Sequence, residues 1–238
     1  MLPQQAAEFT PYGATHLCAV VVMLAGAVGL VLAARHLDDP TDRLGRTLAV
    51  VILTTTLPLQ VLYFTPEHWS LQRSLPIQLC DVATLAAAYA LWTHRWWAVG
   101  LTYYWGLTLT TQAIATPDLR TPFPEPIFLL YWAMHIGTVW AAVHLTWGRG
   151  LVPDWRSYRL AMAATTVWAV LITVANAALG TNYGYLNEKP RAASILDLLG
   201  PWPVYVVAEA LLIAGGWALV TWPWVALRRR RAQPAAPR

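Results

Sequence analysis

The chain has 238 residues, of which 57% are hydrophobic and only 12% are charged. Several apolar runs of about 20 residues are long enough to cross a bilayer, so the composition excludes a soluble globular protein. Little chain remains between these runs, which also excludes a separate soluble domain. We attribute the net charge of +4 to basic residues that face anionic lipid at the membrane surface, and not to nucleic-acid binding.

In chain order, the apolar runs predict seven transmembrane helices, at residues 14–35, 46–65, 75–92, 97–115, 127–147, 159–180 and 202–225. The predicted fold class is therefore an all-α integral membrane protein, a seven-helix bundle formed by one domain (1–227). A basic, disordered cytoplasmic tail is expected at 228–238, and Asp38 to Arg43 are expected to form a solvated connecting loop. We expect no cleavable signal peptide, because the first 13 residues contain no basic side chain.

The distribution of basic residues predicts the orientation of the bundle. Most of them lie in the connections, or at the span ends, that share one side: Arg35, Arg43, Arg46, Arg95, Arg149, Arg156, Arg159, Arg228, Arg229, Arg230, Arg231 and Arg238. The other side has only Arg73, Arg120, Lys189 and Arg191. The positive-inside rule then places the N-terminus outside and the C-terminus in the cytoplasm, as in a multi-pass plasma-membrane protein.

The third span combines an apolar run with several polar side chains. Ser74 is the predicted N-cap and Pro76 lies in the predicted first turn, which places Cys80 beyond that turn. On a helix Cys80 and Thr84 share a face, and Asp81 lies about 100° round it. A carboxylate at membrane depth is costly unless it faces protein or water, so Asp81 marks a candidate functional site.

Polar residues of other spans fall at a similar depth. The outer halves of the spans contain Gln60, Gln78, Cys80, Asp81, Thr84, Gln112, Asn176 and Glu209, and His135 lies near mid-depth. Together they predict a polar cavity that opens to the outside. The alternative is that these side chains only join neighbouring helices in pairs.

Within such a cavity, Cys80 and His135 could act as nucleophile and base, because an imidazole can take the proton of a thiol. Asp81 or Glu209 could orient the imidazole. Three alternatives stay open. Cys80 could be a small apolar residue of the core, or form a disulfide with Cys18, and His135 could be a core residue or a proton relay.

The external loop from Asn182 to Arg191 adds a cationic group. Lys189 is the only lysine in a chain that otherwise uses arginine, which favours a compact ammonium that binds a phosphate or carboxylate headgroup. A solvated loop charge is the alternative. The chain has no HxxxH, HxH or CxxC spacing, so we expect neither a metal nor another cofactor.

Four stretches together resemble a known family. They are Leu75–Asp81, Thr116–Leu119, Asn182–Leu186 with Lys189–Pro190, and Leu196–Pro203. In this order they resemble the YwaF-like bacterial membrane proteins, which are related to the animal transmembrane protein 164 family. The animal relatives are described as acyltransferases that form a thioester on a cysteine and transfer the acyl chain to a lysophospholipid. By position, the resemblance implies that Cys80 is the nucleophile and His135 its base.

The sequence therefore predicts a membrane-embedded lipid acyltransferase or lipid-ester hydrolase in the bacterial inner (cytoplasmic) membrane, with a membrane lipid as substrate. Gln78, Asn182 or backbone amides would stabilise the oxyanion, and Lys189 would bind the headgroup. The remaining substrate-binding residues would be Thr84, Gln112, Asn187 and Glu209. The alternatives are a lipid or small-molecule carrier or receptor, with Asp81, His135 and Glu209 as a relay, and a structural membrane subunit.

Overall fold

The computed structural model describes residues 8–190 and 194–232, and these residues form helices and connecting loops without any strand. The principal helices are α1 (Ala14–His36), α2 (Arg43–Tyr63), α3 (Leu79–Thr93), α4 (Trp96–Tyr104), α5 (Thr110–Ala115), α6 (Pro126–Val143), α7 (Trp155–Leu179) and α8 (Val204–Ala232). Two π-helical segments, η1 (Trp105–Leu109) and η2 (His144–Gly148), continue α4 into α5 and extend α6. Two short 3-10 helices are η3 (Tyr183–Tyr185) and η4 (Ile195–Leu199). The predicted all-helical class is confirmed.

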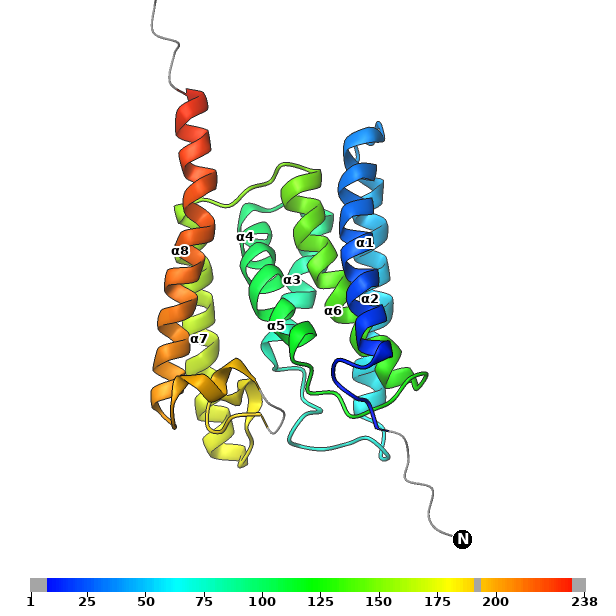
Figure 1. The fold of residues 1–238 in the computed structure, drawn as a ribbon, viewed down its shortest axis with the longest axis vertical. Helices are drawn as coiled ribbons and strands as arrows, with labels where there is room; N and C mark the ends of the chain where they lie inside the picture. The colour runs from blue at the N-terminus through cyan, green and yellow to red at the C-terminus, as the bar shows by residue number, and fades with distance from the viewer. Residues whose placement is uncertain (1–7, 191–193, 233–238) are drawn as a thin grey trace, which may run out of the picture.

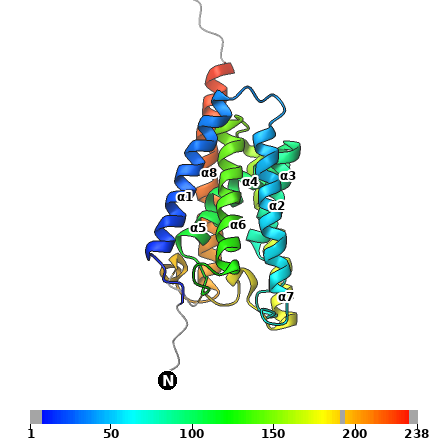
Figure 2. The same cartoon turned by 90° about the vertical axis from the view of Figure 1, so that its right-hand side faces the viewer.

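The helices stand side by side as rods that alternate in direction along the chain (Figure 1). Helix α6 packs against α1, α2, α3 and η1, while α7 packs against α4 and α8. Figure 2 shows the same arrangement from the side. The N-terminus lies at the lower end of Figure 1, here called the N-terminal end, and α8 ends at the opposite, C-terminal end.

Within residues 8–190 and 194–232, five helices are long and apolar enough to cross a membrane: Ala14–His36, Arg43–Tyr63, Pro126–Gly148, Trp155–Leu179 and Val204–Arg230. Helix α3 is apolar but shorter, with 15 residues, and the rod from Trp96 to Ala115 is divided by η1. Leucine and valine side chains remain exposed along the outer faces of α1, α7 and α8, such as Val28, Leu171 and Leu211. Apolar faces of this kind are stable in contact with the lipid of a bilayer.

The predicted start of the third helix is wrong by about one turn. Helix α3 begins at Leu79, with Gln78 as its N-cap, and Ser74 lies in the preceding loop. The backbone groups of Ser74 and Leu75 form hydrogen bonds with side chains that are distant in the sequence. Gln60 Nε2 donates to Ser74 O at 2.6 Å, and the Tyr183 hydroxyl accepts from Leu75 N at 3.0 Å. These tertiary hydrogen bonds replace the first helical turn, so Cys80 occupies the second helical position.

The predicted C-terminal tail also needs a correction. Helix α8 continues to Ala232, so residues 228–232 are helical. The expected disorder therefore fails for this part, and residues 233–238 lie outside the described residues. Leucine and alanine before this arginine run favour helix, and nothing in the run itself stops one.

Candidate functional site

Helices α3 and α6 meet through two buried threonines. The Oγ1 atoms of Thr84 and Thr138 are 2.9 Å apart, and the two residues are 1% and 0% exposed. Thr84 Oγ1 also lies 2.7 Å from Cys80 O, and Thr138 Oγ1 lies 2.9 Å from Met134 O. The two hydroxyl groups have two protons for these three contacts. When one threonine donates its proton to the other, its own contact with a carbonyl oxygen is therefore not a hydrogen bond. The pair fixes the axial register of α3 against α6.

This register sets the level of Cys80 and His135. Both helices run from the N-terminal end towards the C-terminal end (Figure 1). Cys80 precedes Thr84 by four residues, and His135 precedes Thr138 by three, so each lies about one turn closer to the N-terminal end. Cys80 and Tyr131 also pack against the same apolar cluster, which contains residues of α6 on both sides of His135.

Cys80 lies in the first turn of α3, where the described residues supply no hydrogen-bond acceptor for the backbone N–H groups of Leu79 and Cys80. The positive end of the helix dipole favours an anion such as a thiolate at this position. Asp81 follows directly, and its Oδ2 accepts from the backbone N–H of Gln78 at 3.1 Å, which closes the helix start. Because a carboxylate beside the thiol opposes a second negative charge, removal of the thiol proton depends on a base.

His135 has the tautomer that a base requires. The residue is 2% exposed, and its Nδ1 lies 2.8 Å from the carbonyl oxygen of Tyr131. A carbonyl oxygen only accepts, so Nδ1 carries the proton and Nε2 of the neutral ring has a free lone pair. The Tyr131 ring lies 4.1 Å from the imidazole, and its hydroxyl donates to Ala113 O at 3.1 Å. The ring orientation is therefore set by α6 itself and by a tyrosine anchored on α5.

The external loop reaches the start of α3 through Gln78. Gly184 N donates to Gln78 Oε1 at 2.9 Å. The Oδ1 of Asn182 accepts from the backbone N–H groups of Asn187 and Glu188, at 3.1 Å each, and its Nδ2 donates to Glu188 O at 2.7 Å. Asn182 and Asn187 thus hold their own loop together. Their predicted contact with a substrate stays untested.

The remaining predicted site residues lie apart from these contacts. The Nζ of Lys189 lies 5.6 Å from the centroid of the Tyr205 ring, a cation–π contact. Gln112 and Glu209 are half-buried, and within residues 8–190 and 194–232 their side chains form no hydrogen bond. Both Cys18 and Cys80 are free thiols, so the disulfide alternative is not realised.

Sequence reasoning missed Tyr183, which anchors the loop before α3. This tyrosine is 0% exposed, and its hydroxyl donates to Leu71 O at 2.7 Å. Asn176 holds the backbone of Tyr183 through bonds to its N–H and carbonyl, at 2.8 and 2.9 Å. Asn176 is therefore structural and does not line a cavity. The only signal in the sequence is an aromatic residue inside a polar loop.

A second polar group, also missed, lies at the C-terminal end of the bundle. We call Asp42, His94 and His144 the Asp42 cluster. Asp42 Oδ1 accepts from His144 Nε2 at 2.9 Å and from Gly45 N at 3.2 Å, and Oδ2 accepts from His94 Nε2 at 2.7 Å. The expected solvated loop is thus wrong for Asp42, whose side chain is only 2% exposed. It joins the start of α2 to the ends of α3 and α6.

Burial alone would raise the pKa of Asp42. The hydrogen bonds from His144, His94 and Gly45 outweigh that effect, so the pKa of Asp42 lies below its ordinary value of 3.8. Asp42 and His94 both have left-handed backbone conformations, with φ of 51° and 52°. The Nδ1 of His144 is buried and has no hydrogen-bond partner among the residues that the structure describes.

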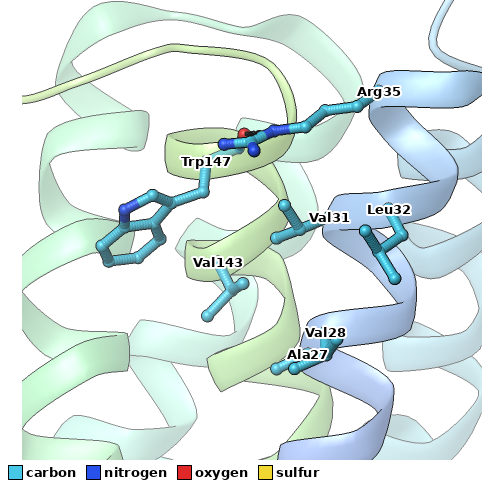
Figure 3. Close-up of a pocket in the computed structure, with 7 residues that line it drawn as sticks. All are labelled: Ala27, Val28, Val31, Leu32, Arg35, Val143 and Trp147. Carbon is cyan, nitrogen blue, oxygen red and sulfur yellow. Dashed lines mark hydrogen bonds between the residues drawn. The ribbon is translucent and has the colours of Figure 1, made fainter.

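Two cavities are found near the C-terminal end. One is a groove of about 260 Å³ between α1 and α6, lined by apolar side chains and by Arg35 (Figure 3). Arg35 reaches across the groove, and its Nε donates to the carbonyl of Trp147 at 3.2 Å. The other, of about 280 Å³, lies between His94, the start of α4, the start of α7 and Arg228. In the described part of the chain, no three His, Cys, Asp or Glu side chains are arranged to hold a metal ion.

Comparison with known families gives one match. A model of the TMEM164 family matches residues 11–221, which is most of the chain and includes both Cys80 and His135. The comparison with curated proteins gives no match, and neither does the comparison with solved structures.

Proposed function

The chain belongs to the TMEM164 family, and from that premise we propose that it is a membrane-embedded lipid acyltransferase or lipid-ester hydrolase with Cys80 as nucleophile and His135 as base. The family and the five apolar helices make it a multi-pass membrane protein. In the proposal all seven rods cross a bacterial plasma membrane, and the N-terminal end faces outside. The arginines gathered at the C-terminal end support this orientation.

The observation that supports the chemistry best is the Thr84–Thr138 contact. It fixes α3 against α6, and Cys80 and His135 precede the two threonines by about one helical turn, which supports a common level for the two side chains. The free lone pair on His135 Nε2 and the place of Cys80 in the first turn of α3 add to this support. Together these observations support a thiol–imidazole pair whose two members belong to facing helices.

The proposed reaction has two steps. His135 takes the proton of Cys80, the thiolate attacks the carbonyl of a lipid ester, and the bond to the leaving alkoxide breaks as His135 returns the proton to it. The acyl chain is then held as a thioester on Cys80. A second hydroxyl, from a lysolipid or from water, loses its proton to His135 and attacks the thioester carbonyl. The C–S bond then breaks, the acyl group passes to the lysolipid or to water, and the Cys80 thiolate takes the proton back from His135. The backbone N–H groups of Leu79 and Cys80, for which the described residues supply no acceptor, would stabilise the oxyanion.

The test uses the two cysteines as a matched pair. Purified protein is incubated with a phospholipid that carries a fluorescent acyl chain, and the hydroxylamine-sensitive label on the protein is measured by intact mass. We expect wild type and Cys18→Ala to be labelled and Cys80→Ala to remain unlabelled. His135→Gln should slow labelling by about 10²- to 10⁴-fold, while His68→Gln, an exposed histidine at the same end, should not change it.

Labelling that survives Cys80→Ala would refute the proposal. A protein that moves lipid between vesicles, tolerates Cys80→Ala and loses that transfer with Asp81→Asn would instead be a carrier.

A further inference from the structure

The cavity between His94 and Arg228 lies at the end of the bundle opposite Cys80, so the proposed acyl chemistry does not use it. Its walls come from four separate elements: the end of α3, the start of α4, the start of α7 with the preceding loop, and α8. It has a volume of about 280 Å³, enough for a small polar group. On one side α4 and α7 are in close contact at Gly100, where an added Cβ would lie 2.9 Å from the Ser157 side chain.

Two arginines face this cavity from different helices. The Arg156 guanidinium lies 3.7 Å from the centroid of the Trp96 ring, which holds its plane in place. Across residues 8–190 and 194–232 nothing accepts a hydrogen bond from Arg156, so its N–H groups remain available. Arg228 on α8 donates to Val152 O at 2.6 Å through one nitrogen, its only hydrogen bond to the part of the chain that the structure describes. A planar guanidinium with free donors is suited to bind phosphate oxygens in pairs.

The other charges around the cavity leave it positive. Asp154 is the only acidic side chain that lines it, and its Oδ1 caps α7 by accepting from Ser157 N at 2.8 Å and from Ser157 Oγ at 2.9 Å. The remaining Oδ2 lies 4.0 Å from Arg228. His94 also lines the cavity, and its Nε2 donates to the buried Asp42 carboxylate at 2.7 Å.

We propose that this cavity binds a phosphate group, with Arg156 and Arg228 as its ligands. Its place at the arginine-rich ends of the helices corresponds to the depth of lipid headgroups, where basic pockets between transmembrane helices bind phosphorylated heads. The same chemistry would accept the phosphomonoester head of a lipid or free inorganic phosphate. The experiment separates these two sources.

Purified protein in an uncharged detergent is titrated with inorganic phosphate in one arm and with dihexanoyl phosphatidic acid in the other, at constant ionic strength. We expect saturable binding in at least one arm. Arg156→Gln and Arg228→Gln should each weaken it by about tenfold or more, the loss of one charge-assisted hydrogen bond. Arg159→Gln and Arg229→Gln are the controls, since these exposed arginines are neighbours on α7 and α8 and do not line the cavity.

Binding of phosphatidic acid alone would identify a lipid headgroup, and binding of inorganic phosphate would identify a soluble ligand. Either result supports the site if only the cavity variants lose affinity. Equal losses in cavity and control variants would show general attraction to a basic surface and would overturn the proposal, as would the absence of binding in both arms. Thermal unfolding of each variant without ligand confirms that it is folded.

Discussion

Replacement of Asp42 by alanine should strongly destabilise the protein, because one carboxylate serves three partners. Loss of the N-cap bond to Gly45 N costs about 1 kcal/mol. The buried His144 loses its only hydrogen bond, which costs about 1–3 kcal/mol. His94 is 34% exposed, so its bond adds only about 0.5 kcal/mol. The sum, about 2.5–4.5 kcal/mol, overlaps the values of about 3–5 kcal/mol for removal of one partner from a buried ion pair.

The assay is equilibrium unfolding of the purified protein in mixed micelles, followed by tryptophan fluorescence. Asp38→Ala is the control, because it removes the same charge from an exposed position in the same loop. It should change the free energy of unfolding by less than about 0.5 kcal/mol. Equal losses for Asp42→Ala and Asp38→Ala would refute the reasoning, since the effect would then come from net charge and not from the Asp42 cluster.

Three further predictions test other contacts and the pH response. The pKa of Asp42 is lower in the folded state than its ordinary value of 3.8, so the carboxylate stabilises the fold above pH 3.8 and this stabilisation is lost as the pH falls through the folded-state pKa. In Asp42→Asn the free energy of unfolding, measured as a function of pH, should therefore fall less steeply below pH 3.8. Gly26→Ala should destabilise the protein by about 1–3 kcal/mol, because its Cβ would lie 2.1 Å from the Trp140 ring, whereas Gly29→Ala meets open space on the same helix and should be neutral or stabilising. Gly184→Ala should cost more than Gly180→Ala, since both have positive φ but only Gly184 faces a tryptophan, at 2.4 Å; equal unfolding free energies within either glycine pair would contradict the packing described.

The sequence predicted the rods well, because apolar runs and the charges between them are visible without tertiary information. The helix starts were less predictable. Ser74 and Pro76 form a standard N-cap signal, yet the tertiary bonds from Gln60 and Tyr183 take the backbone groups that a first turn would have used. Local signals do not show such long-range partners.

The candidate site was predictable in its residue types but not in its contacts. The alternation of the rods was enough to bring Cys80 and His135 to a common region. The tautomer of His135 depends on the carbonyl of Tyr131, which the spacing of four residues permits but does not require. The Asp42 cluster could not be found from the sequence, because its residues are separated by 52 and 102 positions from Asp42 and lie in segments with the composition of ordinary loops and helix ends.

The π-helical segments η1 and η2 allow a helix of the bundle to lose one residue without being interrupted. A π turn contains one more residue than an α turn, so each wide turn stores a single extra residue within a continuous helix. Deletion of Leu107 would let η1 close to an ordinary α turn, and the rod would stay intact. The faces of α4 would remain where they are. Because the wide turn absorbs the extra residue, every side chain from Thr110 to Ala115, Gln112 included, would keep both its helix and the direction in which it points.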